Sequence, residues 1–230
     1  PEHLKACIAR FEADQNCAAV AGLVYRWSAP VDQEEIVSDT TLLDTTALVY
    51  RCLAHVVDRD AGRPWGEVKA LLKEAHTVFG VSGAVSMFRR SHVESVAPDH
   101  LMFDPSFFMY REDVDLALRL YRKGYTSWFD PTVLSFHRRS FKTFTSLWER
   151  VKDERSRPAS LRIASYRNLW WLMTYHVSWS LGAADILSSA VQVAALSLLT
   201  FCASPVSWWK AFHEAMRGMS RALQRRHDLE

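Results

Sequence analysis

Residues 103–124 read FDPSFFMYREDVDLALRLYRKG, and this stretch decides the fold class. An aromatic segment is followed by three carboxylates and then by apolar residues at helical spacing. Carboxylates are favoured at the start of a helix because the first amides lack intrahelical partners and the helix dipole is positive there. The helix is expected to end at Gly124, which suits a C-terminal cap. The three carboxylates are Glu112, Asp113 and Asp115.

The sequence around this helix predicts an α/β fold. Residues 3–14 carry apolar side chains at helical spacing, and residues 18–25 form an apolar run of strand length. Residues 125–129 and 132–136 are predicted as two short strands separated by Asp130-Pro131. In the middle of the chain the pattern is weaker. It favours helices over residues 42–57 and 68–75 and a buried strand over residues 85–88.

After His137 the pattern changes to long helices. They are expected over residues 144–155, 161–177, 186–203 and 206–226. We therefore divide the chain into an α/β domain, residues 1–140, and a helical, partly apolar region, residues 141–230. Residues 186–203 carry no charge over a length near the minimum that spans a bilayer. A membrane span, peripheral attachment and packing as a helical hairpin are the alternatives. Residues 206–226 have the pattern of a basic amphipathic helix, which is typical of a membrane interface.

Composition narrows the function classes. The chain has 230 residues, 49% apolar and 23% charged, which excludes disorder. Its 4 cysteines lack the density of a disulfide scaffold and any C-x-x-C spacing, so reduced, cytosolic thiols are expected. Residues 1–137 carry 14 basic against 19 acidic side chains, whereas residues 138–230 carry 14 against 7. The basic part indicates an anionic partner. Membrane lipid is favoured over nucleic acid, because the arginines are dispersed among tryptophans and form no stripe.

Four ordered blocks of the sequence resemble a known enzyme family. The blocks are residues 81–90 (VSGAVSMFRR), residues 103–119, Gly124-Tyr125 with Pro131, and His137. Together they are similar to the second half of family 2 glycosyltransferases, in particular to the rhamnosyl- and galactofuranosyl-transferase-like members, which have the GT-A fold. The resemblance is strong over residues 80–140. Residues 1–25 are more weakly similar to the helix and strand that follow the metal-binding Asp-x-Asp of that family.

The resemblance implies an inverting, metal-dependent transfer of a sugar from a nucleotide-diphosphate donor to a hydroxyl of a saccharide or lipid-linked acceptor. It places the general base at Asp113. Glu112 and Asp115 would then orient Asp113, bind acceptor hydroxyls or brace the helix. Gly83 and Ala84 match a small pair that lets the backbone approach the bound sugar, the alternative being tight packing against the following strand. Arg89, with Arg90, matches a pair that meets phosphate, although arginines at a strand end are usually solvated.

The resemblance also implies a cation, Mg²⁺ or Mn²⁺, with His137 as one ligand. The alternative for His137 is a hydrogen-bonded structural residue. Asp58-Arg59-Asp60 has the Asp-x-Asp pattern, but it lies beside a Gly/Pro loop and is expected to be a solvated turn. The ligating Asp-x-Asp and most of the donor site are expected upstream of Pro1, so the fragment alone is expected to be inactive.

The lack of a Gln-x-x-Arg-Trp motif favours a single-addition enzyme. The expected place of action is cytoplasmic, at the inner face of the cell membrane, in polysaccharide or cell-envelope synthesis. The competing hypothesis is a non-catalytic membrane-associated module in which residues 112–115 only cap a helix.

Overall fold

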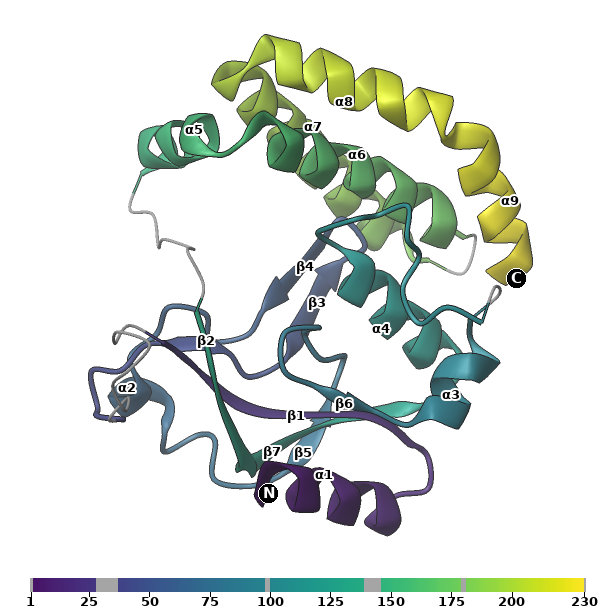
Figure 1. Ribbon diagram of the computed structural model, residues 1–230. Coiled ribbons are helices and arrows are strands. Elements are labelled where there is room, and N and C mark those ends of the chain that lie inside the picture. Colours follow the sequence, from purple (N-terminus) through teal and green to yellow (C-terminus); the bar gives the residue numbers. More distant parts are fainter. Residues whose placement is uncertain (1, 28–36, 98–99, 139–145, 179–180, 230) are drawn as a thin grey trace. The chain divides into compact units, whose positions relative to one another are not determined.

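The computed structural model describes residues 2–27, 37–97, 100–138, 146–178 and 181–229 (Figure 1). They belong to two compact units. The first unit comprises residues 1–49, 57–97 and 116–143, and the second comprises residues 50–56, 98–115 and 144–230. The domain boundary predicted at residue 140 lies outside the described residues. The second unit also takes in residues 50–56 and 98–115, which the sequence had assigned to the first domain.

The first unit contains a mixed sheet with β1 (Cys17–Arg26) at its centre. β1 pairs in parallel with β7 (Thr126–His137) and antiparallel with β2 (Leu43–Thr45) and β6 (Met87–Phe88). β5 (His76–Val78) adds to the other side of β7. The helix α1 (Glu2–Ala13) leads into β1 and packs on the sheet through Cys7, next to Cys17 and Val20. The predicted first helix and first strand are therefore confirmed.

β7 is a single strand where the sequence predicted two. Pairing with β1 is interrupted at Asp130-Pro131, since Ala21 lies opposite Phe129 whereas Leu23 lies opposite Leu134. The intervening residues bulge toward Gly22, where an added Cβ would come 1.8 Å from the Val133 carbonyl oxygen. The absence of a side chain on Gly22 allows this close approach and keeps the strand continuous.

The helix predicted over residues 42–57 is wrong. This segment forms β2 and then a two-stranded sheet of β3 (Leu48–Cys52) and β4 (His55–Asp58). Its β-branched and aromatic residues favour extended backbone, which outweighed the apparent helical spacing. The helix predicted over residues 68–75 is also wrong, because α2 covers only Trp65–Val68. The strand predicted over residues 85–88 shrinks to the half-buried Met87–Phe88.

Two further helices, α3 and α4, are described before residue 125. α3 covers Arg90–Ser95, and α4 covers Glu112–Arg122, as predicted from the three carboxylates. Gly124 has a φ of 85° and its amide donates to the Tyr121 carbonyl, while the Tyr125 amide donates to that of Leu120. This pair of bonds is a Schellman cap, so the predicted end of the helix is confirmed.

The remaining helices belong to the second unit. They are α5 (Leu147–Ser156), α6 (Ala159–His176), α7 (Ala183–Ala203), α8 (Pro205–Arg217) and α9 (Met219–Leu229). α6 is central and packs against α7, α8 and α9. The single helix predicted over residues 206–226 is broken at Gly218, where a Cβ would lie 2.6 Å from the Trp171 ring. The chain thus has the expected α/β class followed by a helical C-terminal region.

Candidate active site

Asp113 lies in the first turn of α4 and is half-buried. Its Oδ1 accepts a hydrogen bond from the Val114 amide at 2.8 Å. Unpaired amides and the positive end of the helix dipole make the first turn of a helix a favourable place for a carboxylate. An Asp in this position can serve as a structural cap or as a proton acceptor.

Glu112, the residue before Asp113, has a carboxyl group with a shifted pKa. Burial raises its pKa, a hydrogen bond from its own backbone amide opposes the rise, and the charge of Asp113 adds to it. Its Oε2 atom is buried and has no hydrogen-bond partner among the described residues. Carboxylates with raised pKa values concentrate at functional sites, because such sites combine burial with neighbouring like charges. The predicted binding role of Glu112 stays a prediction.

Asp115 is fully buried and faces α6. Its Oδ1 lies 2.8 Å from Nε2 of His176, and both side chains are 0% exposed. Of the three roles that the sequence left open for Asp115, this contact supports bracing of the helix. No local pattern predicts the contact with His176, because this residue follows 61 positions later on another helix.

The segment that leads into α4 has unusual backbone geometry. Phe108, Tyr110 and Arg111 have φ values of 60°, 70° and 72°. Left-handed backbone is costly for residues with a Cβ, and it persists only where surrounding contacts hold it. Burial lowers the pKa of Arg111 to about 10, while the charge of Asp113 opposes the shift.

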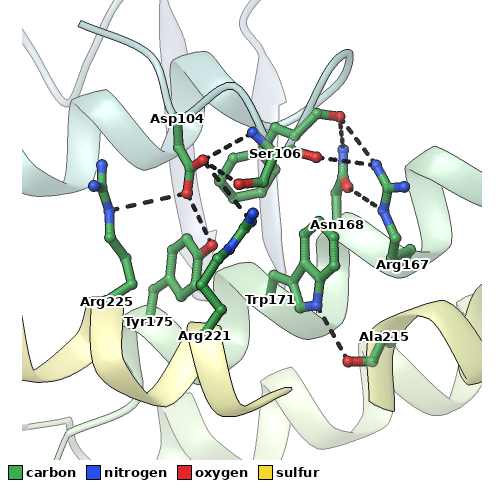
Figure 2. Close-up of polar contacts among 10 residues, drawn as sticks. Asp104, Ser106, Arg167, Asn168, Trp171, Tyr175, Ala215, Arg221 and Arg225 are labelled. Carbon is green, nitrogen blue, oxygen red and sulfur yellow. Dashed lines mark hydrogen bonds and ion pairs between the residues drawn. The ribbon is translucent and has the colours of Figure 1, made fainter. Parts of the chain in front are cut away.

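A network of polar side chains from α6 and α9 holds this segment (Figure 2). Asp104 accepts hydrogen bonds from the Ser106 amide at 2.8 Å and the Tyr175 hydroxyl at 2.9 Å, and it also accepts one from the Ser106 hydroxyl. Arg225 and Arg221 lie 3.9 and 4.0 Å from its oxygens. Burial alone would raise the pKa of Asp104, but these hydrogen bonds and Arg225 lower it overall. Asp104 is thus an ionised anchor for the segment.

The first unit carries the other predicted binding residues. Gly83 and Ala84 are exposed, which does not fit the alternative of tight packing. The Arg89 guanidinium donates to the carbonyl oxygens of Cys17 at 2.9 Å, of Asp14 at 3.2 Å and of Phe11. Its predicted contact with phosphate stays a prediction, but the side chain already joins α1 to β1.

His137 ends β7, and its imidazole contacts a buried carboxylate. Nδ1 lies 2.8 Å from Oδ2 of Asp44, which is 0% exposed, whereas the His137 side chain is 37% exposed. Metal-binding histidines commonly have such a carboxylate on the second ring nitrogen. No group of three His, Cys, Asp or Glu side chains suited to a metal occurs within the described part of the chain. The described residues therefore fit one coordination position and do not make a complete metal site.

The Asp-x-Asp pattern begins at the last residue of β4, Asp58, and continues into the expected turn at residues 59–60. Asp60 has a φ of 59°, and its carboxylate accepts hydrogen bonds from Thr46 at 2.9 Å and Arg63 at 3.1 Å. Its side chain is 13% exposed, so the turn is less solvated than the sequence suggested.

Comparison with known families gives a match that covers most of the chain. The sequence model described as glycosyl transferase family group 2 matches residues 53–212. This range includes Asp113, His137 and the helices α5 to α7. A search of curated proteins gives no match. The observed α/β sheet followed by helices is consistent with part of a GT-A fold together with a helical C-terminal region.

Proposed function

The chain belongs to glycosyl transferase family group 2, and from this premise we propose that it transfers a sugar with inversion and uses Asp113 as the general base. Glycosyl transfer in general, from a nucleotide-sugar donor to an acceptor, follows from the family. The proposal adds the stereochemistry, the base and an acceptor that is a saccharide or a lipid-linked hydroxyl. The observation that carries it is the half-buried carboxylate of Asp113 in the first turn of α4, next to Glu112, whose pKa is raised.

The proposed step is a single displacement. The Asp113 carboxylate takes the proton of the acceptor hydroxyl as the hydroxyl oxygen forms a bond to the anomeric carbon. The bond from that carbon to the diphosphate oxygen breaks, and its electron pair leaves with the nucleoside diphosphate. Attack from the face opposite the leaving group inverts the anomeric centre. A positioned base contributes about 10²–10⁴ in rate.

We further propose that His137 is one ligand of a divalent cation, Mg²⁺ or Mn²⁺. When bound, such a cation stabilises negative charge on a departing diphosphate. The contact between Nδ1 and Asp44 supports the proposal, because it fixes the orientation of the imidazole and favours Nε2 as the coordinating atom.

The proposed function is tested by incubating the full-length protein with UDP-, GDP- and dTDP-sugars, including a rhamnosyl and a galactofuranosyl donor. Release of nucleoside diphosphate is measured with Mg²⁺, with Mn²⁺ and with EDTA. We expect release from one donor class, stimulated by saccharide or lipid-linked acceptors and lost with EDTA. Release unchanged by EDTA would contradict the cation, and no release from any donor would contradict the transferase.

We also propose that the second unit attaches peripherally to an anionic membrane at the cytoplasmic face. Among the described residues, one helix, α7, is long and apolar enough to cross a membrane, and only 17% of its most apolar stretch is buried. Large apolar side chains of α7 and α8 are exposed, namely Ile186, Leu187, Val191, Leu198, Phe201, Val206 and Trp209. Basic residues outnumber acidic ones, 14 to 7, over residues 138–230. This combination suits a negatively charged lipid surface.

Cysteine alkylation tests the membrane attachment. Cys202 on α7 is exposed, whereas burial raises the pKa of Cys7 to about 11 and that of Cys17 to about 12, next to the charges of Asp130 and Asp14 respectively. At pH 8 we expect iodoacetamide to label Cys202 quickly and the other two slowly. Vesicles of phosphatidylcholine and phosphatidylglycerol should protect Cys202 from alkylation. Cys7 and Cys17, which react slowly with or without vesicles, serve as internal controls.

Two further outcomes decide the mode of attachment. Alkaline carbonate should release a peripheral protein, and retention of the protein in the vesicles would contradict this proposal in favour of a span. Equal labelling of Cys202 with and without vesicles, in the absence of cosedimentation, would contradict attachment itself.

A further inference from the structure

Asn168 occupies the centre of the contacts between α6 and the segment before α4. Its side chain is 0% exposed. Its Nδ2 lies 2.8 Å from the carbonyl oxygen of Phe107, 2.7 Å from that of Met109 and 2.9 Å from that of Tyr110. Only the amide nitrogen of an asparagine can donate to carbonyl oxygens, so the side-chain orientation is determined by its surroundings. The Asn168 side chain thus contacts three carbonyl oxygens within four consecutive residues, 107–110.

The neighbouring residue strengthens this clamp. Arg167 donates from Nε to Oδ1 of Asn168 at 3.1 Å, and its Nη2 reaches the carbonyl oxygens of Ser106 and Phe107 at 3.2 and 3.3 Å (Figure 2). Its Nη1 pairs with Glu214 of α8 at 3.0 Å. The Asn168 side chain is therefore oriented by Arg167, and the Arg167 side chain is in turn held by Glu214.

The clamped carbonyls flank the left-handed residues. Phe108 lies between two contacted positions, Tyr110 is itself contacted, and Arg111 follows directly. Backbone of this kind is unfavourable for non-glycine residues unless neighbouring contacts determine it. Asp113 comes two residues after Arg111, so the path of this segment sets where its carboxylate lies. The Arg111 carbonyl also accepts the Asp115 amide at 2.9 Å, which joins the segment directly to the first turn of α4.

We propose that Asn168 is a positioning residue for Asp113. This inference rests on the proposed function, because it assigns Asn168 a role in the rate of the step that Asp113 performs. The Asn168 amide holds the segment in its left-handed path, and the path places the carboxylate for proton removal. Displacement of a reacting group by about 1 Å can lower the rate about 10²-fold.

The test uses two variants of the full-length protein. Asn168→Asp keeps the shape and the oxygen facing Arg167 but replaces the donor with an oxygen that repels the three carbonyls. Asn168→Ala removes the contacts. Leu169→Ala is the matched control, since Leu169 is the next residue on α6, is 0% exposed and belongs to the apolar cluster of Cys52 and Tyr166. The control should lower the melting temperature at least as much as either Asn168 variant.

Two measurements are made on each variant. Amide hydrogen exchange over residues 106–112 should become faster in both Asn168 variants and stay unchanged in Leu169→Ala. With the donor identified from the nucleotide-sugar panel, kcat should fall about 10–100-fold in both Asn168 variants, with the KM for the donor nearly constant. Leu169→Ala should keep kcat near that of the unmodified protein.

The outcomes separate this inference from the proposed function. Faster exchange with an unchanged kcat would overturn the positioning role and leave the base assignment intact. A fall in kcat that Leu169→Ala reproduces would also overturn it, since general destabilisation would then explain the loss. Unchanged exchange in Asn168→Asp would overturn the clamp itself. If Asp113→Asn keeps full activity, the proposed function fails first, whatever Asn168 does.

Discussion

Asp113→Asn is expected to lower the kcat of the full-length protein by about 10²–10⁴, because the amide cannot take the acceptor proton. The substitution preserves the size of the side chain and an oxygen that can accept from the Val114 amide. Donor binding should therefore change little, and the free energy of unfolding should fall only by the interaction of the carboxylate with the helix dipole, about 0.3–1 kcal/mol. Sugar transfer is measured by product formation together with nucleoside diphosphate release.

Glu149→Gln provides the matched control for this prediction. Glu149 is an acidic residue in the first turn of α5, where its amide donates to the Ser146 hydroxyl at 3.2 Å. Both substitutions remove a carboxylate from the start of a helix in the second unit. If residues 112–115 only cap α4, the two variants will behave alike. A large loss of kcat in Asp113→Asn alone supports the base.

Asp115→Ala is expected to reduce the free energy of unfolding by about 3–5 kcal/mol, because it removes one member of a buried carboxylate–imidazole pair and leaves the other in a medium that solvates it poorly. The observation behind this value is the 2.8 Å contact between Asp115 and His176, both 0% exposed. Chemical denaturation followed by circular dichroism measures the change. His176→Ala should cost a similar amount.

A double variant, Asp115→Ala with His176→Ala, distinguishes the loss of their mutual contact from the loss caused by the cavities that the substitutions leave. If the contact dominates, Asp115→Ala combined with His176→Ala will cost less than the sum of the two single substitutions. Glu94→Ala is the control, because Glu94 pairs with Arg90 on the exposed surface of α3 and should matter far less. Additive losses in the double variant would show that the two side chains do not stabilise the fold as a pair.

Local signals in the sequence predicted the elements that depend on neighbouring residues. The apolar spacing of residues 3–14 and the carboxylates before Val114 gave α1 and α4, and Gly124 gave the end of α4. These features succeed because capping and helical periodicity act within a few residues. The family resemblance over residues 80–140 led to the same enzyme class as the match over residues 53–212.

Elements that depend on distant contacts were not predictable. At the break between α8 and α9, Gly218 lies against the Trp171 ring, and in β7 the bulged residues approach Gly22 closely. In both cases the deciding neighbour lies tens of residues away. The strands over residues 42–57 were missed because short apolar runs suit a helix as well as a strand until pairing partners are known.

The candidate site divides in the same way. The sequence allowed three candidates to be named, Asp113, Glu112 and His137, because they lie in the ordered blocks that resemble the family. The distant residues of the site could not be named, since Asn168 contacts Tyr110 across 58 positions, His176 contacts Asp115 across 61, and Asp44 contacts His137 across 93. A lone asparagine in a helix has no pattern that distinguishes a clamp from a surface residue.

The most direct test of the central claim is the single-turnover rate of sugar transfer by Asp113→Asn and by the unmodified protein, both saturated with donor and acceptor. Under these conditions binding and product release do not limit the signal. We predict a rate at least about 100-fold lower in Asp113→Asn, with the same affinity for the donor. Equal single-turnover rates would contradict the assignment of Asp113 as the base.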